Sequence, residues 1–331
     1  MINGYADCSK IQPTIARCND YWNYTSIFNW FFGEGAFCAT NLETLKTLQK
    51  CTDLENLVMC FNGYSLSENI DLSNLTKLKK FIYRCLGGYS YSFIMPSSLE
   101  EINVMNGYCV NLKNCRDLKK LTFNNCWSVN DEFGYCQLNT NADIVVTIDW
   151  LDFGANTLKF LDGKNVTEFH TGVNSDIIYS CDYKCFNLNW PKISDITCPY
   201  MNSVDGTIGG IKNLTNLRSL NLGVDSIVDL SGIENLTNLQ SLDLSSNQIK
   251  DVHKLGNLNK LSTLNLSNNC IFDDTTFFDE NNNKVKIKNL EVLANMNKNG
   301  QLRNLYLSGN TGITDWSILS NITNWTGKSG W

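Results

Sequence analysis

A leucine pattern that recurs every 22 residues constrains the fold of this chain more than any other feature. Residues 214–271 contain three copies of it: LTNLRSLNLGVDSI, LTNLQSLDLSSNQI and LNKLSTLNLSNNCI. The strand motifs of the three copies begin at Leu217, Leu239 and Leu261, so the step is constant. Self-similarity at a fixed period of this size is the signature of stacked repeats. The period therefore predicts a solenoid.

Each copy predicts a short strand with one apolar face. Leu242 and Leu244 lie two positions apart, so both side chains point to the same side of an extended chain. Ser241 and Asp243 point to the opposite side. We expect the leucine side to face the core and the polar side to face outward.

An asparagine follows the predicted strand in the second and third copies, at Asn247 and Asn269. Its side chain both donates and accepts hydrogen bonds, so a stack of asparagines can satisfy backbone groups that the turns bury. Asp225 holds this place in the first copy and supplies only acceptors, so we expect the stack to begin or weaken there. One repeat buries too few aliphatic side chains to offset the ordering of its backbone. Repeats should therefore fill most of the chain.

Looser copies of the frame occupy the sequence before residue 211 and return near its end. Before residue 211 the steps vary from 19 to 27 residues, which predicts an irregular convex side of loops and short helical turns, and the last copy follows a step of 41 residues. Ile144, Val146 and Ile148 indicate a further strand of ambiguous register. The looser copies begin at Leu54, Leu78, Leu99, Leu118, Val166, Ile193 and Leu302.

The block 211–271, with its G-I-x-N-L-T-N-L-x-S-L-x-L linkers, resembles bacterial leucine-rich repeat proteins of the internalin type. Its unit is also similar to the repeat of eukaryotic protein phosphatase 1 regulators, and the irregular half resembles the BspA-type surface repeats. The resemblance implies an α/β solenoid: a leucine-rich repeat horseshoe with a parallel concave β-sheet and irregular convex loops and short helices. It implies that the concave face holds another protein, and it implies no chemistry and no cofactor.

The frame divides the chain into three predicted parts. The N-terminal part is rich in aromatic residues and predicts a cap, and the solenoid follows it. Within the insertion we expect an acidic, Asn-rich loop at 273–284 and then a helix that buries Leu290, Leu293 and Ala294. The parts are an N-terminal cap at 1–50, a solenoid at 51–315 (irregular 51–210, regular 211–271, insertion 272–300, last repeat 301–315), and a C-terminal cap or truncated repeat at 316–331.

Composition limits which classes of partner and which cellular location we expect for this chain. A net charge of −6 without clustered Lys and Arg argues against nucleic acid, and no apolar stretch is long enough for a membrane span. MINGYADCSK shows no basic region followed by an apolar core. From the resemblance we expect an extracellular or cell-surface protein, with a cytoplasmic one as the alternative.

The 14 cysteines are scattered, and several occupy core positions of the frame, such as Cys198. Buried free cysteine behaves as a small hydrophobe, so most are expected to be reduced. A disulfide remains an alternative, most plausibly among Cys8, Cys18 and Cys38.

Catalytic chemistry has little support in the sequence. There are two histidines and no G-x-S-x-G nucleophile elbow, so we expect no enzyme activity. His170, Cys181, Cys185 and Cys198 are of the residue types that bind zinc, which makes a zinc site an alternative interpretation. Packing is the preferred interpretation, because the frame needs Cys198 in the core and points His170 outward. We therefore predict no metal and no catalytic residue.

The outward strand positions supply the candidate site. Exposed aromatic and apolar residues favour protein contacts, so we expect a partner protein to dock around Phe61, Ile82 and Met105. Recurring Gly-Tyr pairs suggest a stacked Tyr ladder or a second binding strip. The alternatives are a self-assembling surface-layer unit, a carbohydrate-binding module and a cytosolic regulatory subunit. The predicted partner-binding residues are Val58, Phe61, Ile82, Arg84, Met105, His170, Tyr200 and Tyr306, and the aromatic strip is Tyr64, Tyr89, Tyr108 and Tyr135.

Overall fold

The computed structural model of the chain contains two compact units, Met1–Trp150 and Leu151–Trp331. It describes residues 49–331 apart from 51, 62–69, 86–92, 106–111, 125–137, 150–151, 154–157, 172–178, 279–280 and 299–301. Most of the predicted cap at 1–50, with Cys8, Cys18 and Cys38, therefore lies outside the described residues.

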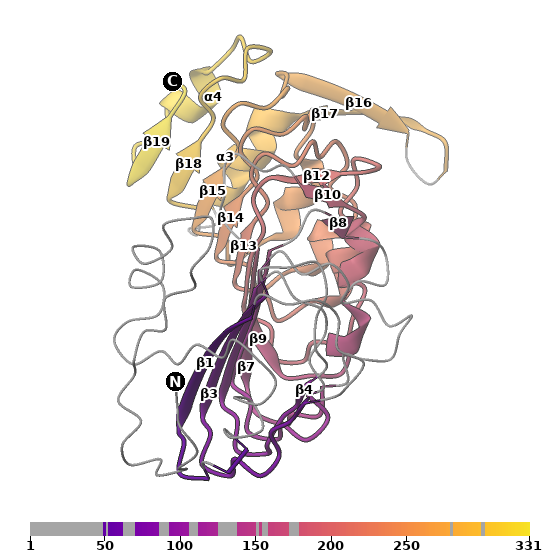
Figure 1. Ribbon diagram of the computed structural model, residues 1–331. Helices are drawn as coiled ribbons and strands as arrows, with labels where there is room; N and C mark the ends of the chain where they lie inside the picture. Colours follow the sequence, from indigo (N-terminus) through magenta and orange to yellow (C-terminus); the bar gives the residue numbers. More distant parts are fainter. Residues whose placement is uncertain are drawn as a thin grey trace, which may run out of the picture. The chain divides into compact units, whose positions relative to one another are not determined.

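The described part of the first unit is built on a parallel sheet with neighbours in chain order (Figure 1). Alternate residues point inward, and the register holds them in line, so that Phe81 pairs with Ile102 and Ile102 pairs with Leu121. These three side chains are at most 1% exposed. A two-stranded parallel sheet of β2 (Ile70–Asp71) and β4 (Phe93–Ile94) accompanies them. The strands of the main sheet are β1 (Asn56–Phe61), β3 (Lys80–Cys85), β5 (Glu101–Met105), β6 (Lys120–Asn124) and β7 (Ile144–Asp149).

Aromatic rings replace leucines in the core of the first unit. Phe93 lies 5.3 Å from Phe81 and 4.8 Å from Tyr83, in tilted and edge-on arrangements that aromatic pairs favour. All three are fully buried. The sequence left the register of the strand at 144–149 ambiguous. In the structure Ile144, Val146 and Ile148 face the core, since all three are 0% exposed.

The second unit repeats the same plan with shorter strands. Leu220, Leu242 and Leu264 occupy one register position on successive strands and are at most 1% exposed. Cys198 is 0% exposed, as the frame predicts. The strands of its main sheet are β9 (Val166–Thr171), β11 (Asp195–Thr197), β13 (Ser219–Asn221), β14 (Ser241–Asp243), β15 (Thr263–Asn265), β18 (Asn304–Tyr306) and β19 (Gly327–Ser329).

Short helical turns lie between the strands, as the irregular repeat steps predicted. They are 3-10 helices of three to five residues, and a second parallel sheet of short strands accompanies them. The helical turns are η3 (Lys159–Leu161), η4 (Tyr183–Phe186), η5 (Gly209–Asn213), η6 (Ile233–Asn235) and η7 (His253–Asn257), and the short strands are β8 (Asp152–Phe153), β10 (Tyr179–Cys181) and β12 (Met201–Ser203).

The turns of the second unit are connected by buried asparagine side chains. Asn247 is 6% exposed. Its Oδ1 accepts hydrogen bonds from the N–H groups of Asp225 and Ile227, at 3.1 and 2.8 Å. Its Nδ2 donates to backbone oxygens of the preceding repeat and of its own, at 2.8 to 3.2 Å. Asn269 and Asn310 make the same kind of contacts one and two repeats further on. The predicted asparagine stack is confirmed.

The stack begins at Asp225, whose carboxyl group accepts hydrogen bonds at both oxygens. Tyr183 Oη donates to Asp225 Oδ2 at 2.7 Å, and Met201 N donates to Oδ1 at 2.5 Å. Asp225 is fully buried, and this burial raises its pKa well above the ordinary value, although the two hydrogen bonds pull in the opposite direction. The first position of the stack is therefore occupied by a carboxyl group that is costly to ionise.

The insertion differs in part from its prediction. The predicted loop at 273–284 is wrong, because most of that segment belongs to an antiparallel hairpin of β16 (Asp274–Phe278) and β17 (Lys284–Lys288). Thr and Phe on one strand and Val and Ile on the other favour extended backbone, and Asn282 takes the left-handed turn at φ 61°. The predicted helix is confirmed as α3 (Asn289–Lys298), and a short α4 (Ser317–Ser320) follows.

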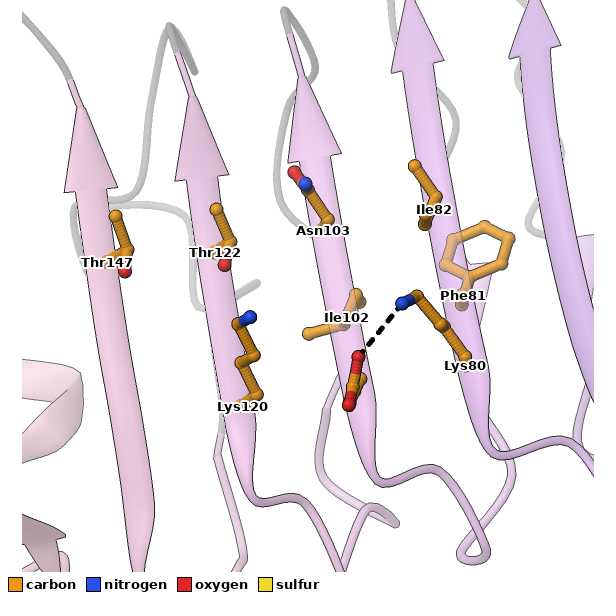
Figure 2. A pocket seen from close by; sticks show the side chains of 9 residues that line it. Lys80, Phe81, Ile82, Ile102, Asn103, Lys120, Thr122 and Thr147 are labelled. Carbon is orange, nitrogen blue, oxygen red and sulfur yellow. Dashed lines mark ion pairs between the residues drawn. The ribbon is translucent and has the colours of Figure 1, made fainter. Parts of the chain in front are cut away.

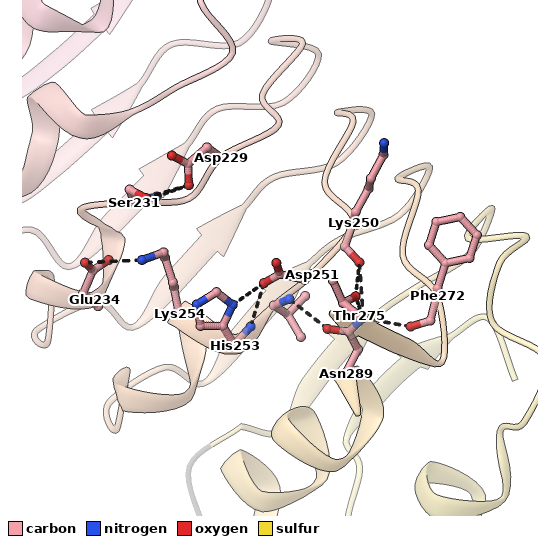
Figure 3. A network of polar contacts seen from close by, with 11 residues as sticks. Asp229, Ser231, Glu234, Lys250, Asp251, His253, Lys254, Phe272, Thr275 and Asn289 are labelled. Atoms are coloured by element: carbon pink, nitrogen blue, oxygen red, sulfur yellow. Dashed lines mark hydrogen bonds and ion pairs between the residues drawn. The ribbon is translucent and has the colours of Figure 1, made fainter. Parts of the chain in front are cut away.

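A buried asparagine at the start of α3 ties the insertion to the repeats (Figure 3). Asn289 Oδ1 accepts from Val252 N at 3.0 Å, and its Nδ2 donates to Phe272 O and Thr275 Oγ1, each at 2.8 Å. The insertion thus reuses the hydrogen-bonding device of the regular turns. Within the described residues, none of the helices is both long and apolar enough to cross a membrane.

Replacing Asn247 with Ala should lower the free energy of unfolding by at least about 2 kcal/mol, because several buried backbone groups lose their partners. Urea unfolding followed by circular dichroism measures the change. The exposed Asn259 is the matched control, and its Ala variant should stay within about 0.5 kcal/mol of the parent. Equal effects at both positions would contradict the role assigned to the stack.

Replacing Asp225 with Asn should change how stability depends on pH. Because the folded-state pKa of Asp225 is raised, its contribution to stability is full below the ordinary value of 3.8 and is lost as pH rises through the folded pKa. The variant has no such titration, so its stability relative to the parent should increase with pH. Urea unfolding between about pH 4 and 8 tests this, with the exposed Asp229→Asn as control. A pH-independent difference would contradict the assignment.

Candidate functional site

The outer face of the first unit, the side of its sheet opposite the core, presents two rows of side chains in register. We call Lys80, Glu101 and Lys120 the charged row, since these residues pair on neighbouring strands β3, β5 and β6. The polar row lies two residues further along each strand and extends to β7. It consists of Ile82, Asn103, Thr122 and Thr147.

The two rows surround a hollow of about 380 Å³ on the outer face (Figure 2). Ile82 and Thr122 are only 8% and 9% exposed, so the floor is well covered by its neighbours. The volume falls within the range of small ligand pockets. The lining residues are Lys80, Phe81, Ile82, Glu101, Ile102, Asn103, Lys120, Thr122 and Thr147.

Some lysines around this hollow form ion pairs with carboxylates, and one does not. Lys80 Nζ lies 3.2 Å from Glu101 Oε2. At the beginning of the strands, Lys119 and Lys79 hydrogen-bond to Glu100 at 2.6 and 2.8 Å and lower its pKa to about 2. Lys120 is exposed, and the described residues give its ammonium group neither an ion pair nor a hydrogen bond. The charged row therefore offers one uncompensated positive charge.

Asn103 lies at the centre of the polar row and lacks a partner for its side-chain oxygen. Asn103 Oδ1 is buried, and no donor lies within hydrogen-bond distance among the residues that the structure describes. Most buried polar atoms in folded proteins are paired, so an exception calls for an explanation. A ligand that donates a hydrogen bond here would supply one.

The corresponding row of the second unit is satisfied internally. Asn221, Asp243 and Asn265 each accept a hydrogen bond from the backbone N–H two residues later, at 2.8 to 3.1 Å. Asn265 Nδ2 also donates to Asp243 Oδ2 at 3.1 Å. These outward polar groups are used within the repeat, which distinguishes this face from that of the first unit.

The predicted site residues fall into separate places. Ile82 lies in the hollow, and His170 and Tyr306 lie on the outer row of the second unit. His170 Nε2 lies 3.3 Å from Glu168, and its Nδ1 lies 3.7 Å from Asp195. Tyr200 lies in a turn after β11 with φ 67°, beyond the strand itself. The side chains of Val58, Phe61, Arg84 and Met105, and all of Tyr64, Tyr89, Tyr108 and Tyr135, lie outside the described residues.

Asn103, Lys120 and Thr147 line the hollow but were missed from the sequence. Their signal was the strand alternation, since Asn103 lies between the inward Ile102 and Val104. The sequence interpretation gave most weight to apolar and aromatic residues at outward positions, and these three residues are neither.

The cysteines weighed as a zinc site are packed as thiols. Cys181, Cys185 and Cys198 are free and at most 1% exposed, and burial raises the pKa of Cys181 and Cys198. Across the described part of the chain, no group of three or more His, Cys, Asp or Glu residues is arranged to hold a metal ion. Cys115 is also buried and free, with its pKa raised to about 12 by burial.

Comparison with known proteins agrees with this repeat geometry. Residues 237–280 match the family model described as Leucine Rich repeats (2 copies). The repeating strand-and-turn unit and this match define the chain as a leucine-rich repeat solenoid, so the predicted fold class is confirmed. No match was found among curated proteins.

Solved structures with some similarity include an internalin, InlF, from Listeria monocytogenes, which is 17% identical over 86% of this chain and 89% of its own, with a TM-score of 0.49. Internalin C2 from the same species is 23% identical over 59% of this chain and 80% of its own, with a TM-score of 0.37. The TLR13–ssRNA13 complex contains a chain that is 16% identical over 85% of this chain and 48% of its own, with a TM-score of 0.46.

Replacing Asn103 with Leu should leave the melting temperature unchanged or raise it, because a buried oxygen without a partner is removed. Differential scanning calorimetry measures the effect. Asn221→Leu on the outer face of the second unit is the matched control and should lower the melting temperature, since Asn221 Oδ1 accepts from Gly223 N at 3.0 Å. A large loss of stability in Asn103→Leu would show that Asn103 serves the fold.

Proposed function

We propose that this chain is a non-enzymatic scaffold that binds a partner protein on the outer face of its first unit. Leucine-rich repeat folds are typical of protein–protein interaction scaffolds. The proposal adds which surface of this chain binds the partner. The observation that carries it is the contrast between the two outer faces. Asn103 and Lys120 lack partners among the described residues, whereas Asn221, Asp243 and Asn265 are hydrogen-bonded within their own repeats.

The shape of this face supports the same proposal. A parallel sheet presents its outward side chains at a regular spacing of about 4.8 Å between strands, which gives a rigid platform for another protein. The hollow of about 380 Å³ offers a pocket in which a projecting side chain can be desolvated. Buried anchor residues of this kind carry most of the binding energy in protein interfaces.

The location in the cell is also part of the proposal. We infer an extracellular or cell-surface protein that contacts a host or neighbouring cell, and this rests on the resemblance of the linkers at 211–271 to those of the internalin type. Fractionation of the source cells, with surface proteolysis of intact cells, tests it. Recovery of the protein only from the cytosol would contradict it.

A photo-crosslinking amino acid at position 147 should capture one specific protein, because Thr147 lines the hollow. The same amino acid at position 221 is the control and should capture none, since Asn221 lies on the satisfied face. The captured protein is then purified and its affinity is measured by calorimetry. Thr147→Arg should weaken that affinity at least about tenfold by filling the hollow.

Two outcomes would contradict this function. Equal capture from both positions would mean that the outer face of the first unit is not special. Capture of the chain by itself, together with concentration-dependent assembly in light scattering, would favour a self-assembling surface layer.

A further inference from the structure

Four groups of the hollow carry information about what it binds: Lys120, Asn103, Thr122 and Thr147. Because the sheet is in register, the arrangement of these groups follows from the strand pairing. Lys120 pairs with Glu101, and Asn103 pairs with Thr122, so Lys120 and Asn103 stand on adjacent strands and are offset by two residues. With strands about 4.8 Å apart and a rise of about 3.3 Å per residue, their Cα atoms are about 8 Å apart.

The first requirement on a ligand is a negative charge near Lys120. Lys80 is engaged by Glu101 at 3.2 Å, and Lys119 by Glu100 at 2.6 Å. Lys120, which stands opposite Glu101 at the end of the charged row, has no ion-pair partner within 4 Å in the described residues. An incoming carboxylate would complete the charge alternation along the charged row.

The second requirement is a hydrogen-bond donor above Asn103. Its Oδ1 is an acceptor, is buried, and has no donor within the described part of the chain. A group with only acceptors, such as a sulfate ion or a free ionised carboxylate, leaves that oxygen unpaired. A peptide meets both requirements at once, since one residue carries a backbone N–H and an acidic side chain within the estimated separation of about 8 Å.

The small free energy of one exposed ion pair indicates that the carboxylate belongs to a larger partner. A single exposed ion pair is worth about 0 to 1 kcal/mol, which cannot hold a small free anion. Attached to a protein that already contacts the outer face, the same pair selects orientation and partner.

The lining argues against a sugar acid as the ligand. Sugars bind through their C–H faces on exposed aromatic rings. The one aromatic side chain among the nine lining residues, Phe81, is 0% exposed and points into the core.

We propose that the hollow recognises an acidic residue, Asp or Glu, in an extended segment of the partner protein. The carboxylate pairs with Lys120, the backbone N–H of the segment donates to Asn103 Oδ1, and the hydroxyls of Thr122 and Thr147 face the remaining polar atoms. This inference rests on the proposed function, because it assumes that the outer face of the first unit is a protein-binding surface.

The test uses a phage-displayed library of random peptides that is selected on the full chain. Selected peptides are then measured by fluorescence anisotropy against the parent and four variants. Thr147→Arg fills the hollow, Lys120→Glu reverses the charge, and Asn103→Leu removes the acceptor. Lys212→Glu is the matched control, as an exposed lysine on η5 of the second unit. Circular dichroism confirms that each variant is folded.

The expected peptides share an Asp or Glu and lose binding to Thr147→Arg. Lys120→Glu should weaken them at least about tenfold and Asn103→Leu about threefold or more, whereas Lys212→Glu should bind as the parent does. A fresh selection on Lys120→Glu should yield peptides enriched in Lys or Arg, since the charge preference follows residue 120.

Failures of the two proposals are distinguishable. Peptides that bind Thr147→Arg as well as the parent would place binding elsewhere and overturn the proposed function together with the inference. Peptides that need the open hollow but carry no acidic residue, or bind Lys120→Glu unchanged, would overturn the inference alone. Enrichment of no peptide, with binding to a uronic-acid oligosaccharide instead, would also overturn it and assign the hollow to sugar acids.

Discussion

Hydrogen bonding by buried asparagine side chains is the interaction on which the second unit depends. A chain that turns after every strand of three residues leaves backbone N–H and C=O groups inside the molecule, where each unpaired group costs about 1–3 kcal/mol. Asn247, Asn269 and Asn310 pair these groups across neighbouring repeats. The leucines supply the apolar burial, but the asparagines permit the turns that bring the leucines into register.

The departures from this pattern show the same constraint at work. Asp225 has no amide N–H groups to donate, and its two oxygens accept instead, from the hydroxyl of Tyr183 and from Met201 N. Asn289 at the start of α3 takes over where the hairpin interrupts the repeats. In both places the buried polar groups are paired, because such groups need partners whatever the local sequence.

The sequence predicted the inward half of the fold, whereas for the outward half the pattern indicates only which positions face out. Period and alternation encode burial, so the strands, the asparagine stack and the helix α3 were all legible from residues such as Leu242 and Asn247. The hairpin was missed because an Asn-rich, acidic composition outweighed the β-forming residues on either side of its turn. The Tyr183–Asp225 contact was not legible either, since it joins residues 42 apart that share no pattern.

The candidate site was the hardest part to predict from the sequence, because the repeat pattern does not determine its residues. Outward positions face solvent or a partner, so stacking tolerates almost any side chain there. The alternation of side chains along the strand is enough to place Asn103 on the outer face. That no described residue donates to its Oδ1 can be seen only in the structure, where the neighbouring strands are in place.

Asn247 and Asn103 show how one residue type serves two purposes on opposite sides of the same kind of strand. Asn247 follows its strand, turns inward, and has both ends of its amide hydrogen-bonded by the protein. Asn103 lies within its strand, points outward, and has a buried oxygen to which none of the described residues donates. The first arrangement gains stability from a complete set of hydrogen bonds, and the second leaves one open. Since an open bond at a buried atom is unfavourable for folding, Asn103 is the position at which the proposed ligand would add a hydrogen bond.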